Sequence, residues 1–344
     1  MQITGSTARR AYLKSSSSEL FMDNREKYLA QQLYLNLACK PFTLILGTSR
    51  VDMTAFTRRF AAHFGATAEN GRYLQLQVRP AFMDSSDLFG WLNLEGEFIP
   101  GAIMDFLKAA HSNPEENYFL CLDRIILSRA EYYLRDILNA VDLRFEPDAV
   151  PYVPAIYYGR DEGAMEKYGV IPVLPNLYMM GTVNLDETSL PLNQRFLDRV
   201  HTMTLTEEDV LQISPSIPKE LKTTYYRLDQ WQEQQVVDDY IRAFERINQI
   251  LIKATSYLGF KVRNEGILYL FHNRKSGLLP EKVAMDQVLC QKVLPRLQGN
   301  AKLMCPVLSE FLAYCEEQGY TQTAGKTAAM LRSCEENGYC SCWE

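Results

Sequence analysis

Five short apolar runs, separated by stretches of helical periodicity, limit most strongly what this chain can fold into. They are rich in aliphatic and aromatic residues and cover residues 42–46, 73–78, 118–122, 177–183 and 200–205. Such runs are typical of strands, and their alternation with helical patterns indicates an α/β layered domain. The sequence therefore predicts an α/β core over residues 41–225.

The pattern changes from about residue 226 onward, where strand-like runs end and helical periodicity takes over. One face of a long helix is traced by Val237, Ile241, Phe244, Ile247 and Leu251. Further helices are predicted at residues 282–297, 306–317 and 323–336. We therefore expect an all-helical lid and C-terminal helical region over residues 226–344, and a short lead helix or linker in residues 1–40.

Residues 147–175 break the α/β alternation. They contain five prolines and three glycines, together with Tyr152, Tyr157 and Tyr158. Such a composition favours an irregular or hairpin insertion. Two interpretations stay open: the insertion reaches a partner or a central pore, or it is a surface loop whose tyrosines pack on the core.

Composition excludes several classes of protein. With 344 residues, 47% of them hydrophobic, the chain can bury a large core, and its formal net charge of −6 argues against a broad nucleic-acid-binding surface. The eight cysteines lack the spacing of a zinc site and are expected to be reduced. Because no apolar run could cross a membrane and the polar N-terminus does not resemble a signal peptide, a cytoplasmic protein is expected.

The segment from Gly47 to Thr54 lies where a phosphate-binding loop is expected, between the first strand and a helix. A working loop has the pattern G-x-x-x-x-G-K-[ST], in which backbone N–H groups and the lysine hold the phosphates. Here Asp52 stands in place of the second glycine and Met53 in place of the lysine. A carboxylate near phosphates and a lost cation should both weaken nucleotide binding.

Polar residues follow the later strands at positions that suit the same chemistry. Asp123 ends the third strand, but Arg124 stands where a second acid would polarise water, and an arginine stays protonated at neutral pH. Asn184 ends the fourth strand, and Arg199 follows a short predicted helix. The alternative interpretations are a helix cap, a turn residue and a surface charge paired with Asp198.

Several motifs together resemble one known family. They are Gln77-Val78-Arg79-Pro80 with Asp84–Gly90, Leu127–Glu131, Gly181–Thr188, Leu192–Arg199 and Gln291–Gly299. From about Pro41 to its end, the chain resembles the McrB-like branch of AAA+ proteins, the motor subunits of modification-dependent restriction systems. The resemblance implies an AAA+ P-loop-type parallel sheet between helices, followed by a helical lid.

The resemblance also implies roles for individual residues. It puts Gly47, Thr48, Ser49 and Thr54 on the phosphate loop, Asp123 with Thr54 at Mg²⁺, and Asn184 at sensor one. It makes Arg199 an arginine finger that acts in trans, and Lys261 or Arg263 sensor two. The implied cofactor is Mg²⁺ with ATP or GTP, and the implied partners are further ring subunits, usually in a hexamer, a nuclease subunit and, through the complex, DNA.

Three departures from the family pattern, Asp52, Met53 and Arg124, favour a degenerate member. We therefore predict a hydrolysis-deficient ring or regulatory subunit of a DNA restriction or phage-defence complex, which supports an active partner and has no cofactor if nucleotide binding is lost. An alternative is an active ATPase or GTPase, in which Arg50 or Arg124 replaces the lysine and Glu187 activates water. A third possibility is a scaffold that binds DNA or protein without forming a ring.

Overall fold

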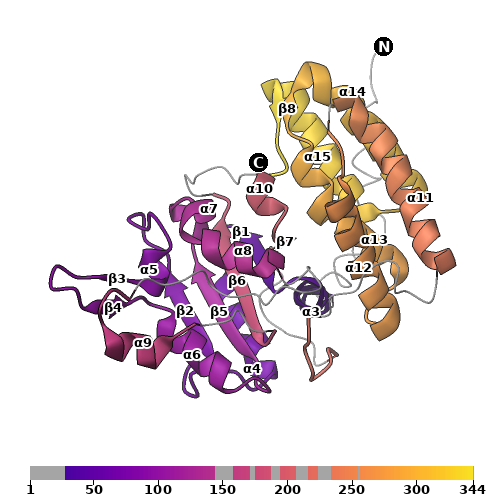
Figure 1. The fold of residues 1–344 in the computed structure, drawn as a ribbon. Helices are drawn as coiled ribbons and strands as arrows, with labels where there is room; N and C mark the ends of the chain where they lie inside the picture. Colours follow the sequence, from indigo (N-terminus) through magenta and orange to yellow (C-terminus); the bar gives the residue numbers. More distant parts are fainter. Residues whose placement is uncertain are drawn as a thin grey trace, which may run out of the picture.

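The computed structural model describes residues 28–143, 158–170, 175–186, 194–206, 216–223, 234–254 and 256–343. An α/β part is built around a five-stranded parallel sheet, and a helical part packs beside it (Figure 1). The predicted combination of an α/β core followed by helices is therefore confirmed at this level.

The sheet contains the five predicted apolar runs as its strands. These are β1 (Phe42–Gly47), β2 (Tyr73–Gln77), β5 (Tyr118–Asp123), β6 (Leu177–Asn184) and β7 (His201–Thr204). Their order in the sheet is β2-β5-β6-β1-β7, and every neighbouring pair is parallel. Because all strands run the same way, their carboxyl ends meet at one edge of the sheet.

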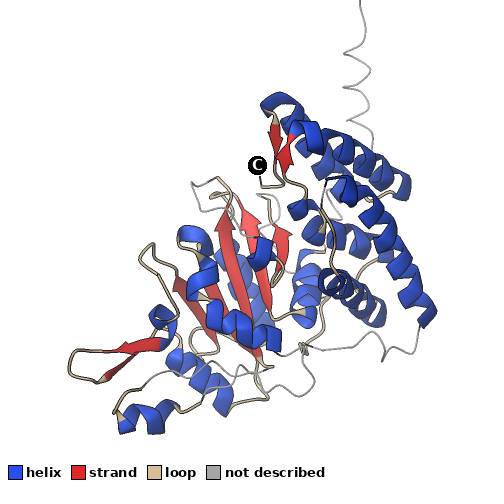
Figure 2. Cartoon of the chain, turned by 45° about the horizontal axis from the view of Figure 1, so that its top comes forward, coloured by secondary structure: helices blue, strands red, loops and turns tan. Residues whose placement is uncertain are grey.

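Helices cover both faces of the sheet (Figure 2), which explains why the central strands are apolar throughout. Successive side chains of β1 alternate between two hydrophobic clusters. Phe42, Leu44 and Leu46 pack with helices α6 (Met104–Ser112) and α8 (Arg135–Leu143). On the other face, Ile45 packs with α3 (Leu29–Cys39) and α4 (Met53–His63).

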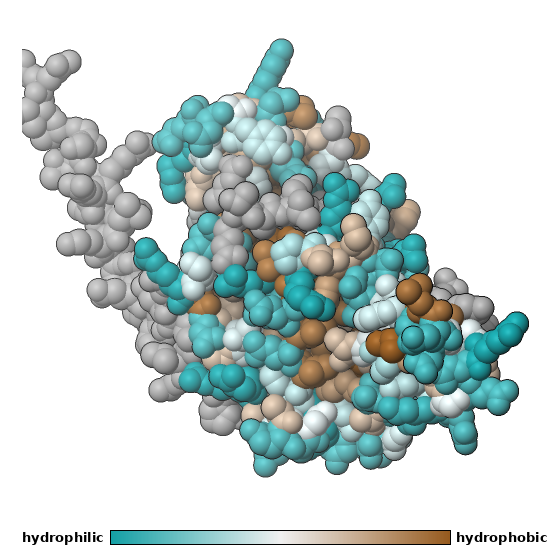
Figure 3. Space-filling model, turned by 90° about the vertical axis from the view of Figure 1, so that its left-hand side faces the viewer, coloured by the Kyte–Doolittle hydropathy of each residue, from teal (hydrophilic) through white to brown (hydrophobic). Residues whose placement is uncertain are grey.

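A small antiparallel hairpin projects from the α/β part and was not predicted from the sequence. It follows α5 (Ser86–Phe89) and consists of β3 (Gly90–Leu92) and β4 (Phe98–Pro100). Leu94 at its tip and Trp91 are exposed, and Figure 3, which views the molecule from this side, shows hydrophobic residues among hydrophilic ones. The strands are only three residues long, too short to give a periodic signal.

The insertion predicted at residues 147–175 is described only in part. Residues 162–168 form a helix, α9 (Glu162–Tyr168), so this portion is not irregular as the prolines and glycines suggested. Asp161 caps the helix by accepting a hydrogen bond from Ala164 N–H at 2.8 Å, and it also accepts one from Phe98 N–H of the hairpin at 3.0 Å. The positions of Tyr152 and Tyr157 lie outside the described residues.

The helical part has its own hydrophobic core. Its main helices are α11 (Gln234–Leu251), α12 (Phe260–Ser276), α13 (Glu281–Lys292), α14 (Ala301–Gln318) and α15 (Thr321–Asn337). Pro306, where the sequence predicted a helix start, lies inside α14. The helix begins earlier because Asn300 caps it, accepting a hydrogen bond from Leu303 N–H at 3.2 Å.

Shorter elements complete the described chain. They are α7 (Ala130–Tyr133), α10 (Gln194–Leu197), the 3₁₀ helices η1 (Ile125–Leu127), η4 (Ile252–Ala254) and η5 (Leu294–Arg296), and the pair β8 (Gly299–Asn300) and β9 (Tyr339–Cys340). In the part of the chain that the structure covers, no helix has the length and apolar character needed to cross a membrane.

A buried group of charges joins the two parts. Lys40, which precedes β1, forms an ion pair of 2.6 Å with Glu265 of α12, and Lys292 of α13 reaches the other oxygen of Glu265 at 3.1 Å. Lys292 also donates to the backbone carbonyl of Val200 at 3.2 Å. These contacts lie at the amino ends of β1 and β7, opposite the edge where the strands end.

Candidate functional site

The strand register brings the ends of β1 and β6 together at the carboxyl edge of the sheet. Gly47 pairs with Asn184, and the N–H of Leu185 donates to the carbonyl of Gly47 at 2.8 Å. In open α/β sheets, ligands bind outside the carboxyl ends of the strands. The predicted loop residues and Asn184 therefore belong to one edge, with Gly47 buried and Thr48, Ser49 and Arg50 exposed.

Asp52 occupies the place where a phosphate would meet the start of α4. Its carboxylate Oδ1 accepts hydrogen bonds from the Ala55 N–H at 2.8 Å and from the Thr54 hydroxyl at 2.9 Å. The hydrogen bond from the Ala55 N–H is the main reason why the pKa of Asp52 is lowered. A helix N-terminus binds anions through its unpaired N–H groups, and here the chain supplies the anion itself.

A second carboxylate lies on the other side of the loop. Asp186, two residues beyond β6, accepts from the Ser49 backbone N–H at 2.8 Å and from the Ser49 hydroxyl at 2.6 Å. The Ser49 hydroxyl is the principal cause of the lowered pKa of Asp186. Two carboxylates of the chain thus engage the Ser49 N–H and the hydroxyls of Ser49 and Thr54 in the predicted phosphate loop, and the Ala55 N–H directly after it.

Met53 turns away from solvent into the core. Its side chain is 4% exposed and belongs to the cluster on the α3 and α4 face of the sheet. A Cβ added to Gly47 would lie 3.2 Å from Met53 Sδ, so the thioether packs directly under the first residue of the loop. The position that holds a phosphate-binding lysine in a working loop serves packing here.

Asp123 and Arg124 follow β5 at the same edge. The Thr182 hydroxyl donates to Asp123 Oδ1 at 2.6 Å and accepts from the Arg124 backbone N–H at 2.9 Å. Arg124 has a φ of 54°, the one positive value at a non-glycine residue in the described part of the chain, and its side chain is exposed. The backbone turns sharply here, as it often does at functional sites.

The structure does not bring Arg199, Lys261 or Arg263 to this edge. Arg199 lies in the turn before β7, and its N–H donates to the Phe196 carbonyl at 2.9 Å. Lys261 is close enough to Lys40 to lower the pKa of that lysine, and Arg263 stacks its guanidinium 5.0 Å from the ring centroid of Phe260. Arg199 directly precedes the amino end of β7, and Lys261 lies near Lys40, which precedes β1, so these two residues are at the amino ends of the strands.

The oxygen atoms present do not fit a Mg²⁺ site that the protein could hold alone. Mg²⁺ takes six oxygen ligands and in such folds is shared with nucleotide phosphates. Thr54 and Asp123 are the two candidates, and each already forms a hydrogen bond with another side chain. Among the residues that the structure describes, no group of three or more His, Cys, Asp or Glu side chains could hold a metal ion.

Sequence reasoning missed the roles of Asp186 and Thr182. Both lie in the motif Gly181–Thr188 that carried part of the family resemblance, but nothing local links them to Ser49 or Asp123. Asp186 and Ser49 are 137 residues apart in the chain. Their contact depends on β6 lying next to β1, which periodicity does not reveal. Glu187, the alternative water-activating residue, lies outside the described residues.

Comparisons with known proteins assign little. Residues 211–339 match a family model described as a domain of unknown function (DUF8727), and no curated protein matches the chain. Two solved structures of Drosophila ORC, bound to Cdc6 and to AT-rich or GC-rich DNA, contain similar chains. Their sequence identities are 13% and 12%, with 87% and 91% of this chain and 91% and 99% of theirs covered. The TM-scores of 0.25 and 0.24 are too low to carry an argument.

Proposed function

We propose that this chain is a McrB-like AAA+ subunit whose phosphate loop no longer works. It serves as a hydrolysis-deficient ring or regulatory subunit of a DNA restriction or defence complex and supports an active partner. The family assignment is based on the sequence motifs, and the parallel sheet followed by helices is compatible with it. Loss of the loop's function has its own structural support.

One observation carries the proposal: the donors that would hold phosphates are already bound to carboxylates of the same chain. Asp52 takes the Ala55 N–H and the Thr54 hydroxyl, while Asp186 takes both donors of Ser49. A nucleotide could reach these donors only by displacing both carboxylates from them. Two negative charges close to a polyphosphate oppose its binding, and Met53 stands where a working loop has its phosphate-binding lysine. Arg50 is near enough to Asp186, and Arg58 and Arg59 to Asp52, to lower the pKa of these carboxylates and so offset part of the repulsion.

The expected size of the defect favours this function over an active NTPase. A hydrogen bond to a charged group contributes about 1.5–3 kcal/mol, so the missing lysine alone costs roughly tenfold to a hundredfold in affinity. Displacing two hydrogen-bonded carboxylates adds to this cost. Arg124 faces solvent beyond a different strand, and its replacement of the second acid removes a general base.

The position of Arg199 fits a role in trans. It precedes the amino end of β7, whereas its own loop follows the carboxyl end of the neighbouring strand β1, and this separation favours action on another subunit. In a ring, the guanidinium would reach the nucleotide of a neighbouring catalytic subunit. A subunit whose own nucleotide site is inactive could in this way still promote hydrolysis in the neighbouring subunit.

Calorimetry with Mg²⁺–ATP and Mg²⁺–GTP tests the proposal. The natural chain should bind neither nucleotide at about 1 mM and should show no turnover. Reverting Asp52→Gly with Met53→Lys restores the loop pattern, and adding Asp186→Ala frees Ser49. Binding should increase at each step, by roughly tenfold or more for the lysine.

Asp161→Gly is a matched control because Asp161 also caps a short helix, by accepting from Ala164 N–H at 2.8 Å, but lies away from the loop. This variant should gain no nucleotide affinity. Micromolar binding with turnover by the natural chain would contradict the proposal. So would a folded triple variant that still fails to bind.

A further inference from the structure

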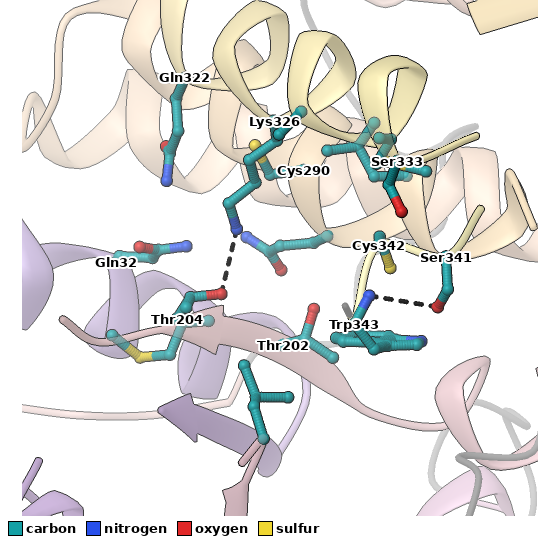
Figure 4. Close-up of a pocket in the computed structure, with 16 residues that line it drawn as sticks. Gln32, Thr202, Thr204, Cys290, Gln322, Lys326, Ser333, Ser341, Cys342 and Trp343 are labelled. Carbon is teal, nitrogen blue, oxygen red and sulfur yellow. Dashed lines mark hydrogen bonds between the residues drawn. The ribbon is translucent and has the colours of Figure 1, made fainter. Parts of the chain in front are cut away.

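A pocket of about 220 Å³ lies between edge strand β7 and helices α13 and α15 (Figure 4). Gln32 of α3 and residues 341–343 close its sides. None of the loop residues 48–55 lines it, although Leu185, whose N–H bonds to Gly47, forms part of the wall. The pocket is therefore separate from the phosphate loop.

One side of the pocket carries a positive charge. Lys326 of α15 reaches down to β7 and donates from Nζ to the Thr204 hydroxyl at 3.1 Å. It is the one charged side chain among the described lining residues. Asp286 lies near Lys326. The charge of Lys326 lowers the pKa of Asp286, but burial is the larger effect and raises that pKa overall. The Asp286 carboxylate accepts hydrogen bonds from the N–H groups of Gln322 and Thr323, both at 2.8 Å.

A second donor in the wall has no partner. Gln291 is 6% exposed and lines the pocket, and its Oε1 lies 2.7 Å from Nδ1 of His201. Burial lowers the pKa of His201 far below its usual range, so the imidazole is neutral and can donate to this oxygen. The amide Nε2 of Gln291 is buried without a hydrogen-bond partner. Buried donors without a partner are unfavourable, and a ligand acceptor would satisfy this one.

The other side of the pocket is formed by Trp343 together with Thr202, Ser333 and Ser341. Figure 4 shows Trp343 beside Thr202 and away from the pair formed by Lys326 and Thr204. Met203, Leu294 and Met330 also line the pocket, and methionine sulfur packs favourably on aromatic rings. The volume is below the ~300 Å³ of sites for drug-sized ligands. It suits a single ring.

We propose that this pocket binds a small monocyclic aromatic carboxylate. The carboxylate accepts hydrogen bonds from Lys326 Nζ and Gln291 Nε2, and the ring packs against Trp343 and the methionines. Such a ligand contacts β7 of the α/β part and α13 and α15 of the helical part at once, so its binding stabilises their arrangement. The inference does not depend on the proposed function of the phosphate loop.

Titration calorimetry with benzoate, phenylacetate and 4-hydroxybenzoate tests the inference, with benzamide as the neutral analogue of benzoate and adenosine as a larger ligand. Quenching of tryptophan fluorescence gives a second readout through Trp343. Lys326→Met should weaken carboxylate binding roughly tenfold to a hundredfold, and Lys326→Arg should retain part of it. Lys302→Met, on the exposed face of α14, makes the same substitution away from the pocket and should change nothing.

Thermal unfolding of each variant establishes that it is folded. Saturable binding of a carboxylate that is lost in Lys326→Met and kept in Lys302→Met supports the inference. Three results would overturn it: no binding of any carboxylate at about 10 mM, equal binding of benzamide and benzoate, or tighter binding of adenosine than of the carboxylates.

Discussion

Lys40 and Glu265 form an ion pair of 2.6 Å that is closed to solvent, with the two side chains 0% and 7% exposed, although they are 225 residues apart in the chain. Lys292 shares the same carboxylate. Two lysines therefore depend on one glutamate, which joins the α/β part to α12 and α13. Because buried charges are costly unless they are paired, the three side chains stabilise the junction only as a set.

Glu265→Gln should destabilise the protein by about 3–5 kcal/mol, because it removes the carboxylate that two buried lysines share. Lys40→Met should cost less, since Lys292 and Glu265 remain as a neutral pair. Glu310→Gln is the control: its ion pair with Lys253 is exposed on the helical surface, and its loss should cost at most about 1 kcal/mol. Urea unfolding measures all three, and equal effects of Glu265→Gln and Glu310→Gln would show that the buried pair does not stabilise the junction.

Lys40 should also make stability depend on pH in the alkaline range. Burial, aided by the charge of Lys292, lowers the pKa of Lys40 to about 8 from its ordinary 10.5. Between these values the unfolded chain binds the proton and the folded chain does not, so stability rises with pH through this window. The free energy of unfolding of the natural chain relative to Lys40→Met should increase from about pH 7 to about pH 9.5. A flat difference would mean that Lys40 titrates normally.

Removing the Asp52 cap should have a modest effect on stability. Asp52→Ala leaves the Ala55 N–H at the start of α4 without its acceptor and should cost about 1 kcal/mol, whereas Asp52→Asn should retain most of the capping. Because the folded pKa of Asp52 is lowered, its contribution is present above the unfolded pKa and is lost as pH falls through the folded value. Thermal unfolding at neutral and acidic pH tests this; an equal effect at both pH values would argue against the carboxylate as the cap.

Two glycine-to-alanine substitutions should change the stability of the fold in opposite directions. A Cβ at Gly181 in β6 would lie 2.8 Å from Ile125 Cδ1 and 2.9 Å from Leu44 Cδ2, so Gly181→Ala should overpack the core and destabilise by about 1–3 kcal/mol. Gly325 in α15 has open space around the added atom, and Gly325→Ala should stabilise by about 0.5–1 kcal/mol. Chemical unfolding of both variants measures the two signs, and stabilisation by Gly181→Ala would show that β6 can shift to accommodate the methyl group.

The apolar runs determined the central strands β1, β5 and β6, since a segment buried on both faces is apolar along most of its length. The sequence also placed the altered loop between β1 and α4 and marked Asp52 and Met53 as departures from a working pattern. It missed the β3–β4 hairpin and put the start of α14 too late. These elements depend on a three-residue strand and on a cap, which leave little periodic signal.

What only the tertiary structure decided are the contacts between distant segments. The sequence predicted that Asp52 would repel phosphate, but the structure shows that its carboxylate is bound at the start of α4 and that Asp186 engages Ser49 from a neighbouring strand. Strand order, the sharing of Glu265 by Lys40 and Lys292, and the pocket beneath Lys326 likewise arise from the packing of remote elements. Local patterns specify which residues are buried and in which element, but the partner of a side chain is set by which elements pack together, and residues far apart along the chain carry no local signal of that choice.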